Sequence, residues 1–574
     1  MKGLFKYLRP FLPRMAYGFV IKVLGTVAEL FLPYILTHIL KNVVVTRDEK
    51  AILFWGGMMI VCSAAALLFN IIANRMAAKV SKDFSGELRQ KLFDKMLSLS
   101  SRQTDRFTIP SLESRITSDT YNVHHFIGMM QRMGVRAPIL LMGGVCITLI
   151  MDAYLALTMV ALLPFILALV IFISKKGVPL YTEVQRSVDS MTGVVREDAQ
   201  GIRVIKALSK VDYENSRFDG VNARLVKSEK KAGMTMGLVN PIMTGLMNIG
   251  ITVVIALAAY RTFNGLSDPE TVIAFMQYFT QISMALMTVT RMFTMYTKSS
   301  ASAKRITEVL ETPVDIGLFQ KSEYPDAKTD AHIFFDNVSF SYIGVKNDLE
   351  NISFSLKKGQ SLGIIGATGS GKSTLIRLLM RFFDVNSGAV YINGENIRTI
   401  PDERLTKMFG LVLQNDFLCA DTIEENIRFG RDISTEDIIS AARVAQADSF
   451  ITNFPDGYQH MLSQKGTNIS GGQKQRVLIA RALASHPEIL ILDDSSSALD
   501  YKTDAMLRVA LKENFSDTTL VTVAQRVSSV KNSDLIIVLD EGRIIGMGDH
   551  ETLLETCLEY REISESQMGG GIIE

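Results

Sequence analysis

An apolar run, Leu362–Ile365, ends in the stretch Gly366-Ala367-Thr368-Gly369-Ser370-Gly371-Lys372-Ser373. This stretch matches G-x-x-x-x-G-K-[ST], a loop in which glycines let the backbone N–H groups point inward around a phosphate. In such a loop Lys372 reaches the β- and γ-phosphates, and Ser373 ligates Mg²⁺. The apolar run before the loop and the helical pattern after it give the motif its required context. The stretch therefore predicts a nucleotide-binding α/β domain with ATP and Mg²⁺ as cofactors.

The sequence around this loop alternates short strand-like runs with helical segments. The strand-like runs include His332–Phe335, Ser361–Ile365 and Ile489–Leu492, and such alternation is typical of an α/β fold. The pattern begins at about residue 331, so we predict an ATP-binding domain over 331–574. The preceding stretch, 311–330, contains Pro313 and Pro325 and is expected to be a linker.

Two further motifs follow the loop. Residues 488–494 read EILILDD, a buried strand ending in carboxylates, and Asp493 is expected in the Mg²⁺ shell. Between the loop and this strand, Ser470-Gly471-Gly472-Gln473 opens a helix. The unpaired N–H groups and positive dipole end of a helix start suit a γ-phosphate. A Ser-Gly-Gly turn alone can be an ordinary helix cap, but the three motifs in this order are a specific signal.

The first 310 residues contain six apolar stretches near or above the roughly 20 residues that cross a bilayer. We place them at 15–40, 51–77, 135–151, 154–174, 236–262 and 271–297, within a membrane domain over 1–310. The connections after the second and the fourth stretch are long, polar and rich in Lys and Arg, which favours the cytoplasmic side for them and for both termini. Long intracellular helices are the preferred interpretation, because neither connection shows strand patterning or a core of its own. The alternative is two independent cytoplasmic domains.

Composition supports a membrane protein with a large soluble part. Of the 574 residues, 48% are hydrophobic and 21% charged, and the net charge of +2 averages two unlike halves. The four cysteines show no metal-ligand spacing, so no zinc site is expected. Six membrane spans exclude a soluble ATPase that works on nucleic acid, and they imply contact with membrane lipid.

With these motifs in this order, the whole chain resembles the type IV ATP-binding cassette exporters of multidrug half-transporter organisation. The resemblance implies that Tyr342 stacks on adenine and that Gln414 touches Mg²⁺ and the attacking water. It implies that the segment 497–500, which ends at Asp500, crosses to a partner subunit. It also implies short coupling helices near Ser111–Thr120 and Tyr213–Val221. The expected ATP-binding residues are Tyr342, Gly366, Thr368, Gly369, Ser370, Gly371, Lys372, Ser373, Thr374, Asp493, Ser470, Gly471, Gly472, Gln473 and Asp500, with Ser373, Gln414 and Asp493 at the metal.

Two positions depart from this family pattern. Where active members carry a glutamate that polarises water, this chain has Asp494, and where they carry a histidine near the γ-phosphate, it has Gln525. The loss of one methylene retracts the carboxylate by about 1.5 Å, enough to lose a hydrogen bond of ~2.6–3.2 Å. Glutamine cannot carry a proton or a positive charge. With Gln414, these residues are the candidate catalytic positions of a degenerate site that binds ATP without turning it over.

The intact Ser470–Gln473 motif serves the opposite site in this family, because two cassettes close head to tail with each ATP between them. One cassette per chain implies a dimer, and a homodimer of this chain would have two impaired sites. We therefore predict a heterodimer with a second, different half-transporter chain. The alternative is a slow homodimer in which Asp494 still acts as a weak base.

Residues that contact the transported substrate lie in no specific sequence motif, unlike those of the ATP site. Lys22 and Glu29 lie seven residues apart in the first span and so share a helical face, which suits a charged pair lining a cavity; alternatively, Lys22 snorkels to the interface. Asparagines in the spans can contact substrate or bridge helices, and the abundant methionines suit either a permissive cavity or lipid contact. Asn248 and Met287 complete the substrate candidates.

These observations predict ATP-driven export of small amphiphilic compounds, drug-like or lipid-like. A lipid flippase or peptide exporter of the same architecture is one alternative, and a regulatory ATP-sensing subunit without its own transport role is another. The layout and the lack of a targeting peptide favour the plasma membrane of a prokaryote.

Overall fold

The computed structural model describes residues 2–265, 269–317, 319–414, 416–495 and 498–568. The chain divides into two compact units. One unit comprises Met1–Ser98 and Phe107–Thr312, and the other comprises Leu99–Arg106 and Pro313–Glu574. Each unit has buried hydrophobic clusters of its own.

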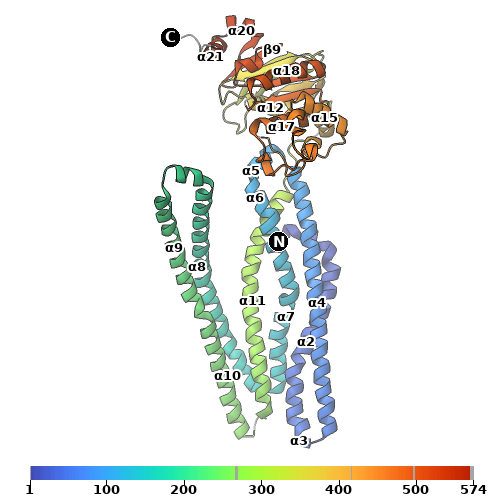
Figure 1. Cartoon of the computed structure of the whole chain (residues 1–574). Helices are drawn as coiled ribbons and strands as arrows, with labels where there is room; N and C mark the ends of the chain where they lie inside the picture. The colour runs from blue at the N-terminus through green and yellow to red at the C-terminus, as the bar shows by residue number, and fades with distance from the viewer. Residues whose placement is uncertain (1, 266–268, 318, 415, 496–497, 569–574) are drawn as a thin grey trace. The chain divides into compact units, whose positions relative to one another are not determined.

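The first unit is all helical (Figure 1). Short turns, including α1 (Phe5–Leu8), lead directly into the first long helix. The loop between α7 and α8 is a single residue, Asp152, whose carboxylate accepts the N–H groups of Tyr154 and Leu155 at 3.0 and 3.2 Å and so caps α8. The helices of this unit are α2 (Leu12–His38), α3 (Val44–Thr46), α4 (Glu49–Leu97), α6 (Ile109–Ser114), α7 (Thr120–Met151), α8 (Ala153–Ala207), α9 (Val211–Gly237), α10 (Val239–Phe263) and α11 (Pro269–Leu310), with π-helical turns at Ile39–Val43 and Arg115–Asp119.

The described residues include five helical segments long and apolar enough to cross a membrane. The expected count of six is therefore not confirmed. The remaining candidate, at the start of α8, has a shorter apolar stretch, Ala153–Phe165, which covers only about 20 Å of helix against a hydrocarbon core of about 30 Å. The five segments are Phe5–Thr46, Glu49–Leu97, Ile109–Met151, Thr244–Phe263 and Glu270–Leu310.

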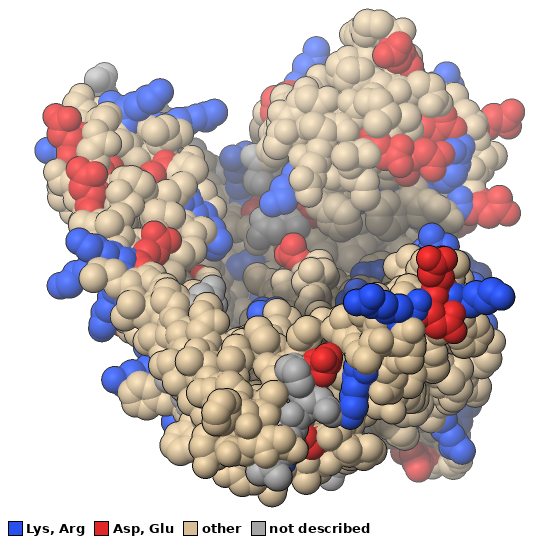
Figure 2. All heavy atoms as spheres, turned by 90° about the horizontal axis from the view of Figure 1, so that it is seen from below, with Lys and Arg blue, Asp and Glu red and all other residues tan. Residues whose placement is uncertain are grey.

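Large apolar side chains cover much of the outside of these helices. Leu53, Ile150 and Phe263 are 76%, 80% and 92% exposed. Seen from below in Figure 2, the near ends of the helices present mainly uncharged residues. Such a surface is costly in water and suits contact with lipid.

Helices α8 and α9 form a long antiparallel pair that turns at Leu208–Lys210. The part of the pair around this turn stands apart from α4, α7 and α11 in the same unit (Figure 1), while α8 also packs against α7 and α11. The short helix expected at Tyr213–Val221 is wrong as a separate element, because these residues lie inside α9. Asp212 and Glu214 in the first turn favour a helix that begins directly after the turn and continues. The segment expected as the other short helix, Ser111–Thr120, is divided among α6, a π-helical turn and the start of α7. The separate short helix that precedes it in the chain is α5 (Ser101–Phe107), most of which belongs to the second unit.

An ion pair between a half-exposed arginine and a buried carboxylate anchors the π-helical turn before α7. Arg305 of α11 binds both carboxylate oxygens of Asp119, which is only 1% exposed. Arg115 donates to the carbonyl oxygen of Arg305 at 2.8 Å and lies 3.1 Å from Glu308. Bidentate geometry makes such pairs strong and directional, so this cluster fixes the turn against α11.

The second unit contains two sheets. The larger has the strand order β10-β9-β3-β8-β7-β6, parallel except for the β9–β10 pair, and the smaller is antiparallel in the order β2-β1-β4-β5. The strands are β1 (Ile333–Phe340), β2 (Leu349–Leu356), β3 (Ser361–Gly366), β4 (Ser387–Ile392), β5 (Glu395–Asn396), β6 (Phe409–Val412), β7 (Ile489–Asp493), β8 (Thr519–Val523), β9 (Leu535–Asp540) and β10 (Arg543–Gly548). The helices are α12 (Lys372–Leu379), α13 (Asp402–Met408), α14 (Ile423–Arg428), α15 (Thr435–Val444), α16 (Asp448–Ile451), α17 (Gly471–Leu483), α18 (Tyr501–Asn514), α19 (Val527–Val530), α20 (His550–Thr556) and α21 (Leu558–Met568). This arrangement is the α/β domain expected from the sequence.

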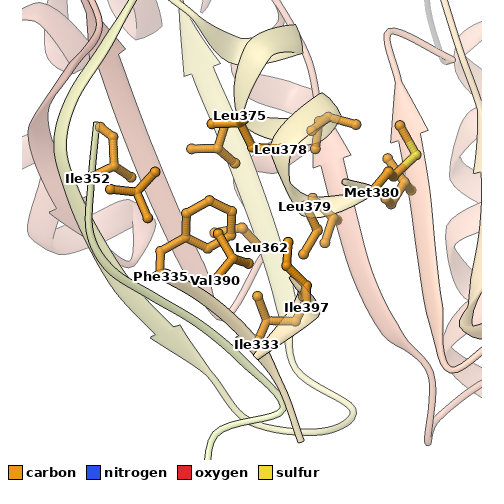
Figure 3. Close-up of a cluster of buried hydrophobic side chains, with 14 of the residues drawn as sticks. Ile333, Phe335, Ile352, Leu362, Leu375, Leu378, Leu379, Met380, Val390 and Ile397 are labelled. Carbon is orange, nitrogen blue, oxygen red and sulfur yellow. The ribbon is translucent and has the colours of Figure 1, made fainter. Parts of the chain in front are cut away.

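The main core of this unit lies between the two sheets and α12 (Figure 3). Phe335 of β1 is fully buried and stacks on Phe354 of β2, with ring centroids 4.7 Å apart. Leu375 and Leu379 cover the same cluster from α12. Because this helix follows the phosphate-loop sequence directly, the core fixes the position of the loop.

We expect Phe335→Ala to destabilise the second unit by about 3–5 kcal/mol, because it leaves a cavity where a stacked ring lies. Urea unfolding of the full chain, followed by circular dichroism, measures the change. Val345→Ala is the control, since Val345 is 89% exposed, and it should change the unfolding free energy by less than about 0.5 kcal/mol. Equal effects of the two substitutions would contradict this account of the core.

Candidate nucleotide site

A cleft of about 590 Å³ lies at the carboxyl ends of the central parallel strands. Ligands of open α/β sheets bind at this edge. The structure brings together at this cleft most of the residues expected at the phosphate and the metal: Thr368, Gly369, Gly371, Lys372, Ser373, Thr374, Gln414, Asp493, Asp494 and Gln525.

The loop before α12 takes a shape that requires glycine. A Cβ on Gly366 would lie 2.1 Å from the carbonyl oxygen of Leu539 in β9. Gly371, which caps α12, has φ +103°, and a Cβ there would lie 2.7 Å from Leu349. An L side chain at either position would collide or be strained. The loop thus runs close to two strands and directs the first N–H groups of α12 toward the cleft.

Lys372 and Ser373 lie at the start of α12. The Lys372 ammonium donates to the carbonyl oxygens of Gly366 and Ala367 at 2.8 and 2.7 Å. Burial lowers the pKa of Lys372, and the nearby carboxylates Asp493 and Asp494 oppose that shift. A positive charge held at the mouth of the loop suits an anionic phosphate chain.

Oxygen donors for a divalent cation lie beside the lysine. Ser373 Oγ donates to Asp493 Oδ2 at 3.4 Å, and burial at the end of β7 raises the pKa of Asp493. Gln414 lines the same cleft. Hydroxyl, carboxylate and amide oxygens are ligands that Mg²⁺ prefers, so these residues fit the metal. Ser370 Oγ is buried and has no hydrogen-bond partner within the part of the chain that the structure describes.

The two departures from the family pattern lie at the same cleft. Asp494 has a left-handed backbone, with φ +51°, and its N–H donates to the carbonyl oxygen of Val523 at 2.9 Å. Gln414 Nε2 donates to Asp494 Oδ2 at 3.2 Å. Gln525 follows β8, and Asp494 follows β7, the strand next to it. Both side chains therefore lie where a phosphate bound to the loop would end.

Gln567 of α21 was not expected from the sequence. Its amide donates to the carbonyl oxygen of Gln525 at 2.9 Å and accepts the N–H of Val527 at 2.8 Å. One side chain thus holds the backbone on both sides of Arg526. A lone glutamine near the end of a chain gives no signal of this role.

A second group of unexpected residues forms the rim of the cleft: Lys346, Asn347, Asp348, Val523, Ala524, Glu541 and Gly542. A Cβ on Gly542 would lie 2.5 Å from the carbonyl oxygen of Asp348. The glycine turn between β9 and β10 is the only sequence signal here, and it does not reveal which segment lies opposite.

Tyr342 lies next to the cleft. Its ring packs edge-on against Phe340 and Phe383, with centroids 4.9 and 5.1 Å apart, and its hydroxyl donates to Thr374 Oγ1 at 3.3 Å. Stacking on adenine remains a prediction. The position beside Thr374 is compatible with a base held next to the loop.

The Ser470–Gln473 motif lies away from this cleft within the unit. Ser470 caps α17: its Oγ accepts the N–H of Gln473 at 3.3 Å, and Gln473 Oε1 accepts the N–H of Ser470 at 2.9 Å. Gly471 has no neighbouring atom near the position of a Cβ, and Gly472 lies against the carbonyl oxygen of Ala498. The helix start is therefore exposed and open to a ligand from outside the chain.

Asp500 caps α18 rather than lining the cleft. Its carboxylate accepts the N–H and hydroxyl of Thr503 at 3.0 and 2.7 Å, and these hydrogen bonds lower the pKa of Asp500. Ser497, in the same expected segment, lies outside the described residues.

The expected Lys22–Glu29 pair is wrong. Lys22 donates to Oδ1 of Asn70 and of Asn74 in α4, at 2.6 and 3.1 Å, while Glu29 binds Arg136 of α7 at 2.5 and 3.2 Å. Residues seven apart share a helical face but lie about 10 Å apart along the axis, so neighbouring helices supply better partners. Asn70 and Asn74 thus bridge α4 to α2 through Lys22.

The other two substrate candidates lie elsewhere. Asn248 is exposed on α10, and its carbonyl oxygen accepts the hydroxyl of Thr252 at 2.8 Å. Met287 of α11 packs against an apolar cluster of the membrane helices.

Comparisons with known proteins agree with this architecture. A family model described as the ABC transporter transmembrane region matches residues 15–286, and one described as ABC transporter matches residues 349–497. An uncharacterized ABC transporter ATP-binding protein of Mycobacterium tuberculosis is 33% identical over 567 residues, covering 98% of this chain and 97% of that relative. The similarly described YfiB of Bacillus subtilis is 33% identical over 571 residues, covering 99% of each chain.

Among solved structures, the chain is similar to a bacterial Atm1-family ABC exporter with ATP bound. The TM-score is 0.81 at 23% identity, and the match covers 98% of this chain and 99% of that one. At this identity the similarity shows the exporter fold alone.

These findings confirm the expected membrane protein with an ATPase domain whose hydrolysis of ATP is coupled to transport. The relatives from Mycobacterium tuberculosis and Bacillus subtilis are both bacterial proteins. Over almost its full length, the chain belongs to the ABC transporter family, with a transmembrane region followed by one ATP-binding domain.

Proposed function

We propose that this chain is one half of a heterodimeric exporter of amphiphilic compounds, and that its own ATP site binds nucleotide without turning it over. The observation that carries the proposal is the pair Asp494 and Gln525 at the cleft of the phosphate loop. Both stand at the reacting end of the expected nucleotide, while the loop and metal residues keep their ordinary types.

In the proposed site, the loop N–H groups and Lys372 bind the phosphates. Ser373, Asp493 and Gln414 hold Mg²⁺, which neutralises phosphate charge when bound. The residues that should orient and activate the attacking water are the ones that differ from active members of the family. The Asp494 carboxylate is one methylene shorter than glutamate, and it accepts a hydrogen bond from Gln414. Gln525 supplies no proton and no charge. Binding is thus retained while activation of water is lost.

The intact Ser470–Gln473 motif supports the choice of a heterodimer. Its exposed helix start has free N–H groups for a γ-phosphate, and the phosphate cleft of its own chain lies elsewhere. We propose that it completes an active site in a different half-transporter whose glutamate and histidine are intact. Hydrolysis there resets the membrane domain after nucleotide-driven closure.

ATP turnover by this chain alone tests whether its own site is degenerate. Purified in lipid, it should bind Mg²⁺-ATP but hydrolyse it at a near-zero rate. Replacing Asp494→Glu and Gln525→His together should raise turnover at least about tenfold, because a placed general base contributes a large rate factor. Phosphate release measures the rate, and retention of labelled ATP on a filter measures binding.

A matched control keeps this test selective. Lys372→Ala should abolish nucleotide retention in both backgrounds, because it removes the phosphate-binding charge. Brisk, cooperative hydrolysis by the unaltered chain alone would overturn the heterodimer and make this a homodimeric exporter.

A substitution at Ser470 separates its role as a helix cap from its proposed role at a phosphate. Ser470→Asp keeps a capping acceptor for α17 but places a negative charge where the γ-phosphate of the partner site would lie. In the complex with the partner chain, we expect ATP turnover to fall at least about tenfold, with nucleotide retention at this chain's own loop unchanged. Ser470→Thr keeps the cap without the charge and should retain most activity. If Ser470→Asp lowered retention at the own loop and left turnover intact, the assignment of the motif to the partner's site would fail.

A further inference from the structure

A second cavity lies among the helices of the membrane unit and is open on one side, since most of its lining residues are exposed. It has a volume of about 370 Å³, within the usual size of small-ligand pockets. Four helices contribute to it, so its shape depends on how they pack. It is lined by Lys22 of α2, Asn74 of α4, Arg291 of α11, and His125, Met129, Arg132, Met133 and Arg136 of α7. We call these eight residues the cationic chamber.

Four chamber residues of α7 form one stripe. His125, Met129, Arg132 and Arg136 are separated by four, three and four residues, the spacing of a single helical face. A stripe with two arginines facing hydrocarbon would be costly, and charged groups within membrane helices normally face the bundle interior or a water-filled space. The stripe therefore marks the inner face of the membrane unit.

The charges of the chamber are not balanced. Glu29 binds Arg136. Among the described residues, the Glu29 carboxylate is the only one within ion-pair distance of a Lys or Arg side chain of the chamber. Lys22, only 4% exposed, is held by the neutral amides of Asn70 and Asn74. Arg132 donates to the carbonyl oxygen of Gly128 at 3.0 Å. Within the described part of the chain, three of the four cationic side chains thus lack a carboxylate partner.

The chamber lies near one end of the spans. Lys22 is seven residues, or about 10 Å, from the start of the first expected span, and Arg291 is six residues, or about 9 Å, from the end of the last one. Arg136 stands at the start of the third expected span. On these expected spans, all three positions lie within about 10 Å of the end on the side from which the long helices extend beyond the membrane, close to the level of the lipid head groups.

The donors match one ligand chemistry. Guanidinium groups bind phosphate or carboxylate through paired hydrogen bonds, and they do so more strongly than neutral donors. Lys22 uses two of its three N–H donors on asparagine, which leaves one for a ligand. Met129 and Met133 add flexible apolar contacts that can cover the start of an alkyl chain.

We propose that the cationic chamber binds the anionic head group of a membrane amphiphile, such as a phosphate or carboxylate ester, as the transported substrate. This inference rests on the proposed export function and narrows its substrate from amphiphiles in general to anionic ones. It also assigns roles: Arg132, Arg291 and Lys22 bind the anion, and Glu29 positions Arg136.

Binding to the full-length chain tests the proposal. The chain, with any half-transporter that co-purifies, is placed in nanodiscs of phosphatidylcholine without nucleotide and titrated calorimetrically with decyl phosphate. We expect decyl phosphate to bind at least about tenfold more tightly than decyltrimethylammonium, since charge-assisted bonds favour the anion. Arg291→Gln and Arg132→Gln should each weaken that binding about tenfold.

The control variant is Lys175→Gln. It removes one positive charge from an exposed position of the same unit outside the chamber, and it should leave binding unchanged. Arg291→Lys keeps the charge and should retain most of the affinity, which separates loss of charge from loss of fold. Equal binding of the anionic and cationic decyl compounds, or equal effects of Arg291→Gln and Lys175→Gln, would overturn the proposal.

Competition by inorganic phosphate against decyl phosphate shows whether the bound anion comes from the membrane or from solution. Weak competition by inorganic phosphate is expected if the ligand comes from the membrane, whereas competition as strong as that of decyl phosphate would overturn the amphiphile in favour of a soluble anion. The titrations require no ATP hydrolysis and no particular partner. A failed heterodimer would appear in the turnover experiments and leave these titrations unaffected, so the two failures are distinguishable.

Discussion

The close approach of Gly366 to the carbonyl oxygen of Leu539 is the constraint on which the nucleotide site depends. No side chain fits in that space, so the loop must turn beside β9 before α12 can begin. The apolar face of α12 then packs into the core beneath it. This fixes Lys372 and Ser373 next to the ends of β7 and β8, where Asp493, Asp494 and Gln525 follow.

The backbone that carries Asp494 and Gln525 is held by contacts other than those of their side chains, so it tolerates substitutions at these two positions. Asp494 keeps its backbone bond to Val523, and the backbone on either side of Arg526, beginning at Gln525 itself, is held by Gln567 from α21. Neither support depends on the chemical identity of the side chain that is presented. The chain can therefore lose the groups that activate water and keep a site that binds nucleotide, which is the division of labour proposed for a heterodimer.

The sequence predicted the α/β domain well, because the phosphate-loop motif and the EILILDD strand each carry a local signal. It also located most of the cleft, since parallel strands bring their carboxyl ends to one edge. It failed where the partner of a residue lies far along the chain. Glu29 binds Arg136 and Lys22 binds Asn70 and Asn74, pairings that depend on which helices pack together. The span count is not confirmed for another reason: the apolar start of α8 is short among the described residues.

The cationic chamber holds more positive charge than the carboxylates among the described residues of the membrane unit neutralise. Like charges gathered close together repel one another, and an anionic head group would relieve that repulsion while it is bound. The cations come from α2, α7 and α11, so a rearrangement that moves these helices apart disperses the positive charge and weakens the site. Affinity would then depend on conformation without any dedicated switch residue, and a ligand that binds one arrangement better shifts the population toward it. An exporter needs that linkage, since its substrate must bind tightly on one side and be released on the other.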